Sequence, residues 1–174
     1  SGVMAVLHVV GCKGLLDARD ADRLEACTAQ LVHLFLSAET KNLPVTLDKE
    51  SDDLVHWCHG AAGIPELVRN AACHARVRAP AADLDVLEAA ARRAADLIWE
   101  RGLLLKGAGL CHGVAGNAYA FLSVASWLHD SDRLRKRAVA FAAMIDNPAL
   151  KAAQAATRDP QRKVTGLPDS PDSL

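Results

Sequence analysis

Apolar side chains recur at helical spacing along most of the chain, and no segment alternates apolar with polar residues as a half-buried strand does. Residues 20–37 show this most clearly, and Asp20 and Asp22 lie where the positive end of a helix dipole would be. The pattern therefore predicts an amphipathic helix whose apolar stripe consists of Leu24, Cys27, Leu31, Leu34 and Phe35.

The same periodicity predicts further helices over residues 81–101, 115–129, 132–145 and 149–157, the first of which ends at Gly102. Residues 1–10 begin inside what looks like the first turn of a helix, so we interpret them as the stump of an earlier repeat. The tail, residues 158–174, is rich in proline and polar residues and is typical of a linker or loop. Abundant alanine and scarce aromatic residues agree with an all-α fold.

A short motif occurs twice, 53 residues apart, as CHGAAG at residues 58–63 and CHGVAG at residues 111–116. Each copy leads into a helix, so the repeating unit reads loop, motif, helix, turn, helix. A single helical hairpin cannot bury both of its faces, and such units must stack or close into a ring. The repeated unit thus predicts that residues 1–174 form part of a toroid of helical hairpins. We expect the parent protein to be longer at both ends.

The charge balance of the chain indicates which kinds of binding partner to expect. The chain has 20 basic and 21 acidic residues and no basic stripe interleaved with aromatics, which argues against nucleic acid and favours a small solute or a peptide. No apolar run is long enough to span a bilayer, and no secretory signal precedes the first helix.

The odd cysteine count favours a reducing, cytoplasmic compartment. Cys12, Cys27 and Cys73 have no neighbouring metal-ligand residue in the sequence, and we predict that they are small buried hydrophobes.

The two Cys-His pairs are the strongest candidates for chemistry. Glycine at the third and sixth positions of each motif allows a sharp turn from loop into helix and a close backbone approach. Neighbouring repeats would then direct Cys58, His59, Cys111 and His112 toward one point, where zinc is the natural occupant. The plainer interpretation is two helix N-termini whose Cys and His side chains merely pack or form hydrogen bonds.

Spacing alone leaves the ligand set undecided. Two thiolates and one imidazole would leave a fourth position for water or substrate, as in a catalytic site, whereas a fourth protein ligand would close it. An open, thiolate-rich zinc site favours the binding and deprotonation of a substrate thiol. Lys106, in a glycine-flanked loop, would anchor an anionic substrate group, although the residues by themselves favour a solvated loop lysine.

Three longer strings carry a family resemblance: LVHWCHGAAG at residues 54–63, GLLLKGAGLCHG at 102–113 and GNAYAFL at 116–122. Through them the chain resembles the lanthionine synthetase C-like (LanC-like) proteins, and the His that follows the first Cys is closer to the eukaryotic branch than to the bacterial cyclases.

The resemblance implies an α/α toroid with a central zinc held by Cys58, Cys111 and His112 and a fourth position open to a thiol. His59 then becomes a pocket residue, a candidate proton donor or acceptor, and Lys106 a contact for glutathione or phosphate. The implied reaction adds glutathione to dehydroalanine or dehydrobutyrine in formerly phosphorylated proteins or peptides. The alternatives are a non-catalytic zinc- and glutathione-binding scaffold, or a lanthionine-forming peptide cyclase.

Two departures accompany the resemblance. A further acid/base histidine of the family would fall upstream of Ser1, and another family repeat would begin past Leu174. Ala108 also stands where the family has an aromatic residue in the glycine-rich loop. On this interpretation the chain carries the metal ligands without the whole ring or the full catalytic set, so the fragment alone need not be active.

Overall fold

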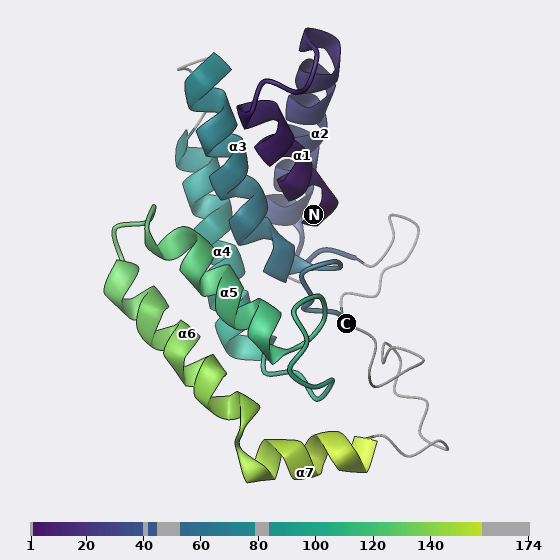
Figure 1. The fold of residues 1–174 in the computed structure, drawn as a ribbon, viewed down its shortest axis with the longest axis vertical. Coiled ribbons are helices and arrows are strands. Elements are labelled where there is room, and N and C mark those ends of the chain that lie inside the picture. The colour runs from purple at the N-terminus through teal and green to yellow at the C-terminus, as the bar shows by residue number, and fades with distance from the viewer. Residues whose placement is uncertain (1, 40–41, 45–52, 79–83, 158–174) are drawn as a thin grey trace.

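The computed structural model describes residues 2–39, 42–44, 53–78 and 84–157 (Figure 1). Within these ranges every regular element is helical, which confirms the predicted all-α class. The elements are α1 (Gly2–Cys12), α2 (Ala18–Ser37), a short 3-10 turn η1 (Ala61–Gly63), α3 (Ile64–Arg78), α4 (Leu84–Arg101), α5 (Val114–Ala125), α6 (Ser131–Ile145) and α7 (Pro148–Thr157).

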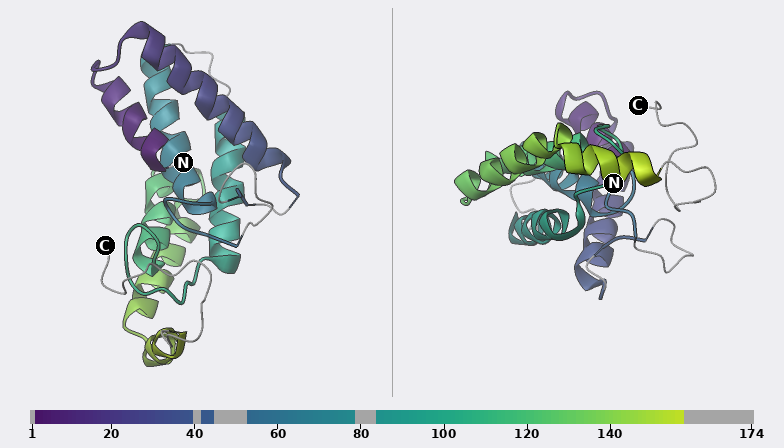
Figure 2. Two further views of the ribbon diagram at one scale, coloured as in Figure 1. Left: turned by 90° about the vertical axis from the view of Figure 1, so that its right-hand side faces the viewer. Right: turned by 90° about the horizontal axis from the view of Figure 1, so that it is seen from below.

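The long helices form successive hairpins, α1–α2, α3–α4 and α5–α6, and α3 packs against both α1 and α5 (Figure 1). The first helices of the three hairpins therefore lie side by side, and α2 packs against α4 behind them (Figure 2). Helix α7 follows α6 and runs across its end (Figure 1). Residues 1–10, predicted as the stump of a repeat, thus belong to α1, which forms a hairpin with α2, and this hairpin stacks on the next one as that hairpin stacks on the third.

Small side chains allow these helices to approach closely. Ala90, Ala91 and Ala94 of α4 are completely buried, as are Ala61 and Ala62 of η1. Larger residues fill the remaining space between the hairpins, and the fully buried ones include Phe35, Ile64, Leu67, Ile98 and Phe121. The many alanines of the sequence therefore serve the close packing of the helices.

Arg137 joins the second and third hairpins. From α6 its guanidinium donates a 2.7 Å hydrogen bond to the Asp96 carboxylate of α4 and stacks over the Trp99 ring, 5.1 Å from the centroid. Phe141, one turn further along α6, packs against Trp99 and, edge to face, against Phe121. The hairpins are therefore connected on their outer side as well as through their first helices.

Most predicted helices are confirmed, with shifts at their ends. The helix predicted from residue 115 to 129 ends at Ala125, because the backbone turns over Trp127 and Leu128, whose N–H groups both bond to the Val124 carbonyl. The last helix begins at Pro148, where Asn147 caps it by accepting from the N–H groups of Ala149 and Leu150. The tail and the start of the 81–101 helix lie outside the described residues.

The prediction that three cysteines are buried hydrophobes is wrong. Cys27 and Cys73 are exposed and Cys12 is half-buried. In α2 the buried stripe consists of Ala21, Leu24, Thr28, Val32 and Phe35, so Cys27 lies just beside it. A shift of one residue along a helix turns a side chain by about 100° and can move it from the core to solvent.

A candidate metal centre

The site is formed by two loops, one leading into η1 and α3 and the other into α5. Hydrogen bonds between their backbones join the two loops. The N–H groups of Trp57 and Cys58 both donate to the Cys111 carbonyl, at 3.1 and 3.4 Å. The relative position of the two motif cysteines therefore depends on main-chain contacts, which hold them more firmly than side-chain packing alone would.

Two buried asparagine side chains, Asn42 and Asn117, hold the first loop in place through hydrogen bonds to its backbone. Asn42 donates to the Leu54 carbonyl at 3.0 Å and accepts from the Ala61 N–H at 2.8 Å. Asn117, on α5, donates to the carbonyls of Val55 and Gly102 at 3.0 and 2.7 Å, and so bridges the loops of both motifs. Each amide pairs backbone groups that would otherwise be buried without partners.

The glycines in each motif are required for geometric reasons. Gly60 has φ +94°, and a Cβ there would lie 1.9 Å from the Leu54 carbonyl oxygen. A Cβ on Gly116 would lie 1.8 Å from the Leu110 carbonyl oxygen. A side chain at either position would push the loop off the start of the helix that follows it.

Three of the four predicted ligand residues come together. One donor atom each from Cys58, Cys111 and His112 lies within 4.8 Å of the others, and this is the only such cluster of at least three His, Cys, Asp or Glu residues in the part of the chain that the structure describes. Because all three residues are half-buried, a ligand from solvent can approach them.

The electrostatics favour a cation at this position. Burial, together with the hydrogen bond and the charge interaction with Cys111, raises the pKa of Cys58 to about 11. In the absence of a positive charge Cys58 therefore remains a protonated thiol at neutral pH. A divalent metal ion would reverse that preference, because it binds and stabilises the thiolate form.

Lys106 lies close enough to interact with both thiols. It is half-buried; burial lowers its pKa, while Cys58 and Cys111 act in the opposite direction. Lys106 is thus more buried than the solvated loop lysine that the residues alone favoured.

The first loop carries two histidines, His56 and His59, whose surroundings differ. His59 is exposed, and its Nδ1 lies 3.3 Å from the Cys58 sulfur, but it is outside the cluster of three donors. His56 is only 3% exposed, and its ring centroid lies 6.1 Å from that of His112. Burial, followed by the charges of Lys106, His112 and His59, lowers the pKa of His56 to about 3, so it stays neutral.

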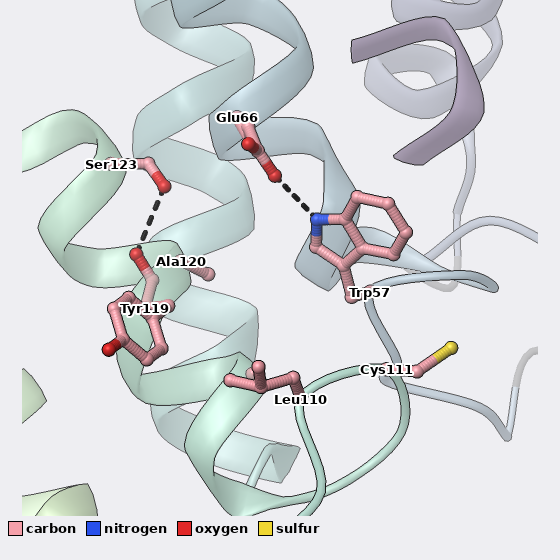
Figure 3. A pocket seen from close by; sticks show the side chains of 8 residues that line it. Trp57, Glu66, Leu110, Cys111, Tyr119, Ala120 and Ser123 are labelled. Carbon is pink, nitrogen blue, oxygen red and sulfur yellow. Dashed lines mark hydrogen bonds between the residues drawn. The ribbon is translucent and has the colours of Figure 1, made fainter. Parts of the chain in front are cut away.

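A pocket of about 380 Å³ lies beside the second motif, between the first turn of α3 and one face of α5 (Figure 3). In it Glu66 accepts a 2.6 Å hydrogen bond from the Trp57 indole. Figure 3 shows the Cys111 side chain pointing away from Leu110 and Tyr119. Cys111 thus both lines this pocket and belongs to the donor cluster. The residues lining the pocket are Trp57, Glu66, Leu110, Cys111, Gly116, Tyr119, Ala120 and Ser123.

Sequence reasoning did not find the two asparagine anchors. Asn42 lies in a loop with no recognisable motif and offered no signal. Asn117 did offer one, because it is a polar residue in the first turn of an otherwise apolar helix, and it is only 1% exposed.

Comparison with known proteins shows the family of the chain. Residues 1–163 match the sequence model of the lanthionine synthetase C-like proteins, and the chain belongs to this family. It is 44% identical over 83 residues to the glutathione S-transferase LANCL1 of Danio rerio, covering 48% of this chain and 19% of that protein. It is 36% identical over 110 residues to the LanC-like protein GCL1 of Arabidopsis thaliana, covering 63% of this chain and 24% of the relative.

The chain therefore spans about a fifth to a quarter of the length of these two relatives, at 19% and 24%. None of the described helices combines the length and the apolar character that a membrane span requires.

Proposed function

We propose that this chain is part of a zinc-dependent enzyme that activates a thiol, that of glutathione, for addition to dehydroalanine or dehydrobutyrine in proteins or peptides. Cys58, Cys111 and His112 are the proposed metal ligands, and the cytoplasm is the proposed compartment. The observation that carries the proposal is the convergence of these three donors, from two successive hairpins, to within 4.8 Å. The name of the Danio rerio relative, a glutathione S-transferase, supports glutathione as the thiol.

The donor set suits zinc. Zinc takes thiolate sulfur at about 2.3 Å and imidazole nitrogen at about 2.0–2.1 Å in tetrahedral geometry, and two sulfurs with one nitrogen occupy three of its four positions. Bound there, zinc would lower the pKa of an incoming thiol and favour its nucleophilic thiolate form.

The reaction has two further steps, formation of the carbon–sulfur bond and protonation of the α-carbon, and side chains of this chain assist them. In the addition, the glutathione sulfur forms a bond to the β-carbon of the dehydroamino acid, and the electron pair of the double bond moves toward the α-carbon and its carbonyl. The α-carbon then takes up a proton. His59 is the proposed donor, because its side chain is exposed beside the candidate ligands, with Nδ1 3.3 Å from the Cys58 sulfur.

Lys106 is the proposed anion contact. Its ammonium group lies near both thiols, in a half-buried loop where a charge interaction is less screened than in open solvent. It would bind a carboxylate of glutathione or stabilise negative charge that develops on the acceptor.

The test begins with the metal. The reduced 174-residue chain is equilibrated with zinc, dialysed and measured for zinc content and by X-ray absorption, with and without glutathione. The proposal predicts one zinc with two sulfurs, one nitrogen and one exchangeable light atom, and a third sulfur when glutathione is added. Cys111→Ala should lose both zinc and glutathione-dependent thiol addition to a dehydroalanine peptide, while Cys27→Ala, at an exposed cysteine of α2, should keep both.

Two results would refute the proposal. One is a fully reduced chain that retains no zinc. The other is a zinc whose four positions are all taken by protein side chains and which binds no glutathione sulfur, since that result would favour the scaffold alternative. A dehydrated peptide that cyclises through its own cysteine, in preference to reacting with glutathione, would indicate a peptide cyclase.

A further inference from the structure

A second pair of thiols lies outside the candidate metal centre, where α1 meets α3. Cys12 is the last residue of α1, and Cys73 lies in the second half of α3, 61 positions further along the chain. The two thiols are close enough for Cys73 to raise the pKa of Cys12. Neither belongs to a cluster of three possible metal ligands among the described residues.

The packing of α1 on α3 holds these two residues together. Ala5 accepts a hydrogen bond from Asn70, and His8 lies 3.1 Å from His74 through their Nδ1 atoms. Near the end of α1 the helices are so close that a Cβ on Gly11 would lie 2.7 Å from the His74 ring. The register of α1 on α3 thus places Cys12 beside Cys73 through contacts along the whole length of α1.

From this geometry we propose that Cys12 and Cys73 form an oxidisable dithiol, which a small disulfide such as glutathione disulfide converts to a reversible disulfide bond between α1 and α3. Exposed Cys73 is the entry point, and half-buried Cys12 is the resolving thiol. The sulfurs must close to about 2.0 Å, and Cys12 has freedom to do so because the helix ends there and turns at Gly14, which has φ +69°.

The reaction balances in two exchanges. The Cys73 thiolate attacks one sulfur of glutathione disulfide, forming a mixed disulfide and releasing one glutathione. The Cys12 thiolate then attacks the Cys73 sulfur, forming the protein disulfide and releasing the second glutathione. Two protein thiols are oxidised, one small disulfide is reduced, and the two thiol protons end on the released glutathione molecules.

The environment of Cys12 suits the resolving role. Burial, and after it the Cys73 thiol, raises the pKa of Cys12, while the cationic side chains of Lys13 and Arg69 act in the opposite direction. Cys12 is therefore the slower thiol toward a reagent in solution, but it attacks efficiently once Cys73 carries a mixed disulfide beside it.

The experiment incubates the zinc-loaded 174-residue chain with buffers of increasing ratio of oxidised to reduced glutathione, followed by alkylation and peptide mapping by mass spectrometry. The expected product is a Cys12–Cys73 cross-link, while Cys27, exposed on α2 and the control cysteine, takes up glutathione as a mixed disulfide. The cross-linked chain should melt about 5 °C or more above the reduced chain, because the bond closes a loop of 61 positions.

Two variants separate the roles of the thiols. In Cys12→Ser, Cys73 should accumulate the mixed glutathione disulfide, and in Cys73→Ser the cross-link should be lost. Cys27→Ser should still form the cross-link. The proposal is overturned if Cys12 and Cys73 stay reduced at ratios that already modify Cys27, or if each carries only its own glutathione. Because the cross-link is mapped peptide by peptide, these outcomes do not depend on whether the metal centre is catalytic.

Discussion

Lys106 shows how much the surroundings of one residue decide. In the sequence it is a lysine in a glycine-flanked loop, a type of residue that is usually solvated. In the structure the loop folds back onto the start of α5, where the Val114 N–H donates to the Gly107 carbonyl at 3.0 Å. This fold half-buries Lys106 and brings its charge near Cys58 and Cys111.

Replacement of Lys106 by alanine should weaken glutathione binding by about 10-fold or more, because a hydrogen bond to a charged group contributes about 1.5–3 kcal/mol. Zinc content should not change, since Lys106 is not a ligand. Titration calorimetry with the zinc-loaded chain measures both quantities. Lys136→Ala, at an exposed lysine of α6, is the matched control, and equal affinities in the two variants would return Lys106 to the class of solvated loop residues.

Gly116 is a second residue whose identity is set by its neighbours. Gly116→Ala should destabilise the chain by about 3 kcal/mol or more, because the new Cβ would lie 1.8 Å from the Leu110 carbonyl oxygen and force the loop before α5 to move. Zinc retention should fall with it. Gly109→Ala is the control, since no atom lies within 4 Å of a Cβ at that position. Urea denaturation of both variants gives the comparison, and similar midpoints would contradict the close approach.

At the scale of elements, helices α1, α2 and α3 meet at a buried polar network. The ring of His8, which is 1% exposed, lies with Nε2 2.8 Å from the Thr28 hydroxyl and Nδ1 3.1 Å from His74. Thr28 in turn donates to the Leu24 carbonyl. Burial, followed by the charge of His74, lowers the pKa of His8 from 6.5 to about 4. The packing of the first hairpin on α3 therefore requires a neutral His8.

This network predicts a loss of stability in mild acid. In the unfolded chain His8 takes up a proton near pH 6.5, whereas in the folded chain it does so only near pH 4. The free energy of unfolding should therefore fall as the pH is lowered from 6.5 to 4, by up to about 3 kcal/mol from this residue.

Urea denaturation at several pH values measures this effect as the difference between wild type and His8→Gln. The variant removes the titrating group and should show a shallower decline. His33→Gln, at an exposed position on α2, should decline as wild type does. Identical pH profiles for wild type and His8→Gln would contradict the assignment.

At the scale of the whole molecule, the candidate metal centre connects successive hairpins. Cys58 precedes the α3–α4 hairpin, and Cys111 and His112 precede the α5–α6 hairpin. A metal ion held by all three would therefore stabilise the stacking of hairpins as well as the loops.

Zinc at 100 times its dissociation constant should stabilise the folded chain by about 2.7 kcal/mol, which corresponds to roughly 5–10 °C in melting temperature. A chelator should remove this increment from wild type and from Cys27→Ser, but not from Cys58→Ser. Differential scanning calorimetry with and without zinc tests the prediction, and a melting temperature of wild type that is indifferent to both zinc and chelator would refute it.

The helical class, the repeated unit and most helix ranges were predictable from the sequence, because helical periodicity and turn residues act within one or two turns of the chain. The repetition of CHG likewise indicated which cysteines to pair, since corresponding positions of stacked repeats are neighbours. The spacing of the motifs left open which of the two histidines joins the cysteines; the family resemblance implied His112, and the tertiary structure brings it to them. Only the tertiary structure decided that Lys106 is half-buried near these thiols and that Cys12 meets Cys73. These relations depend on loop conformation and helix register between segments tens of residues apart, for which no local pattern of residues carries a signal.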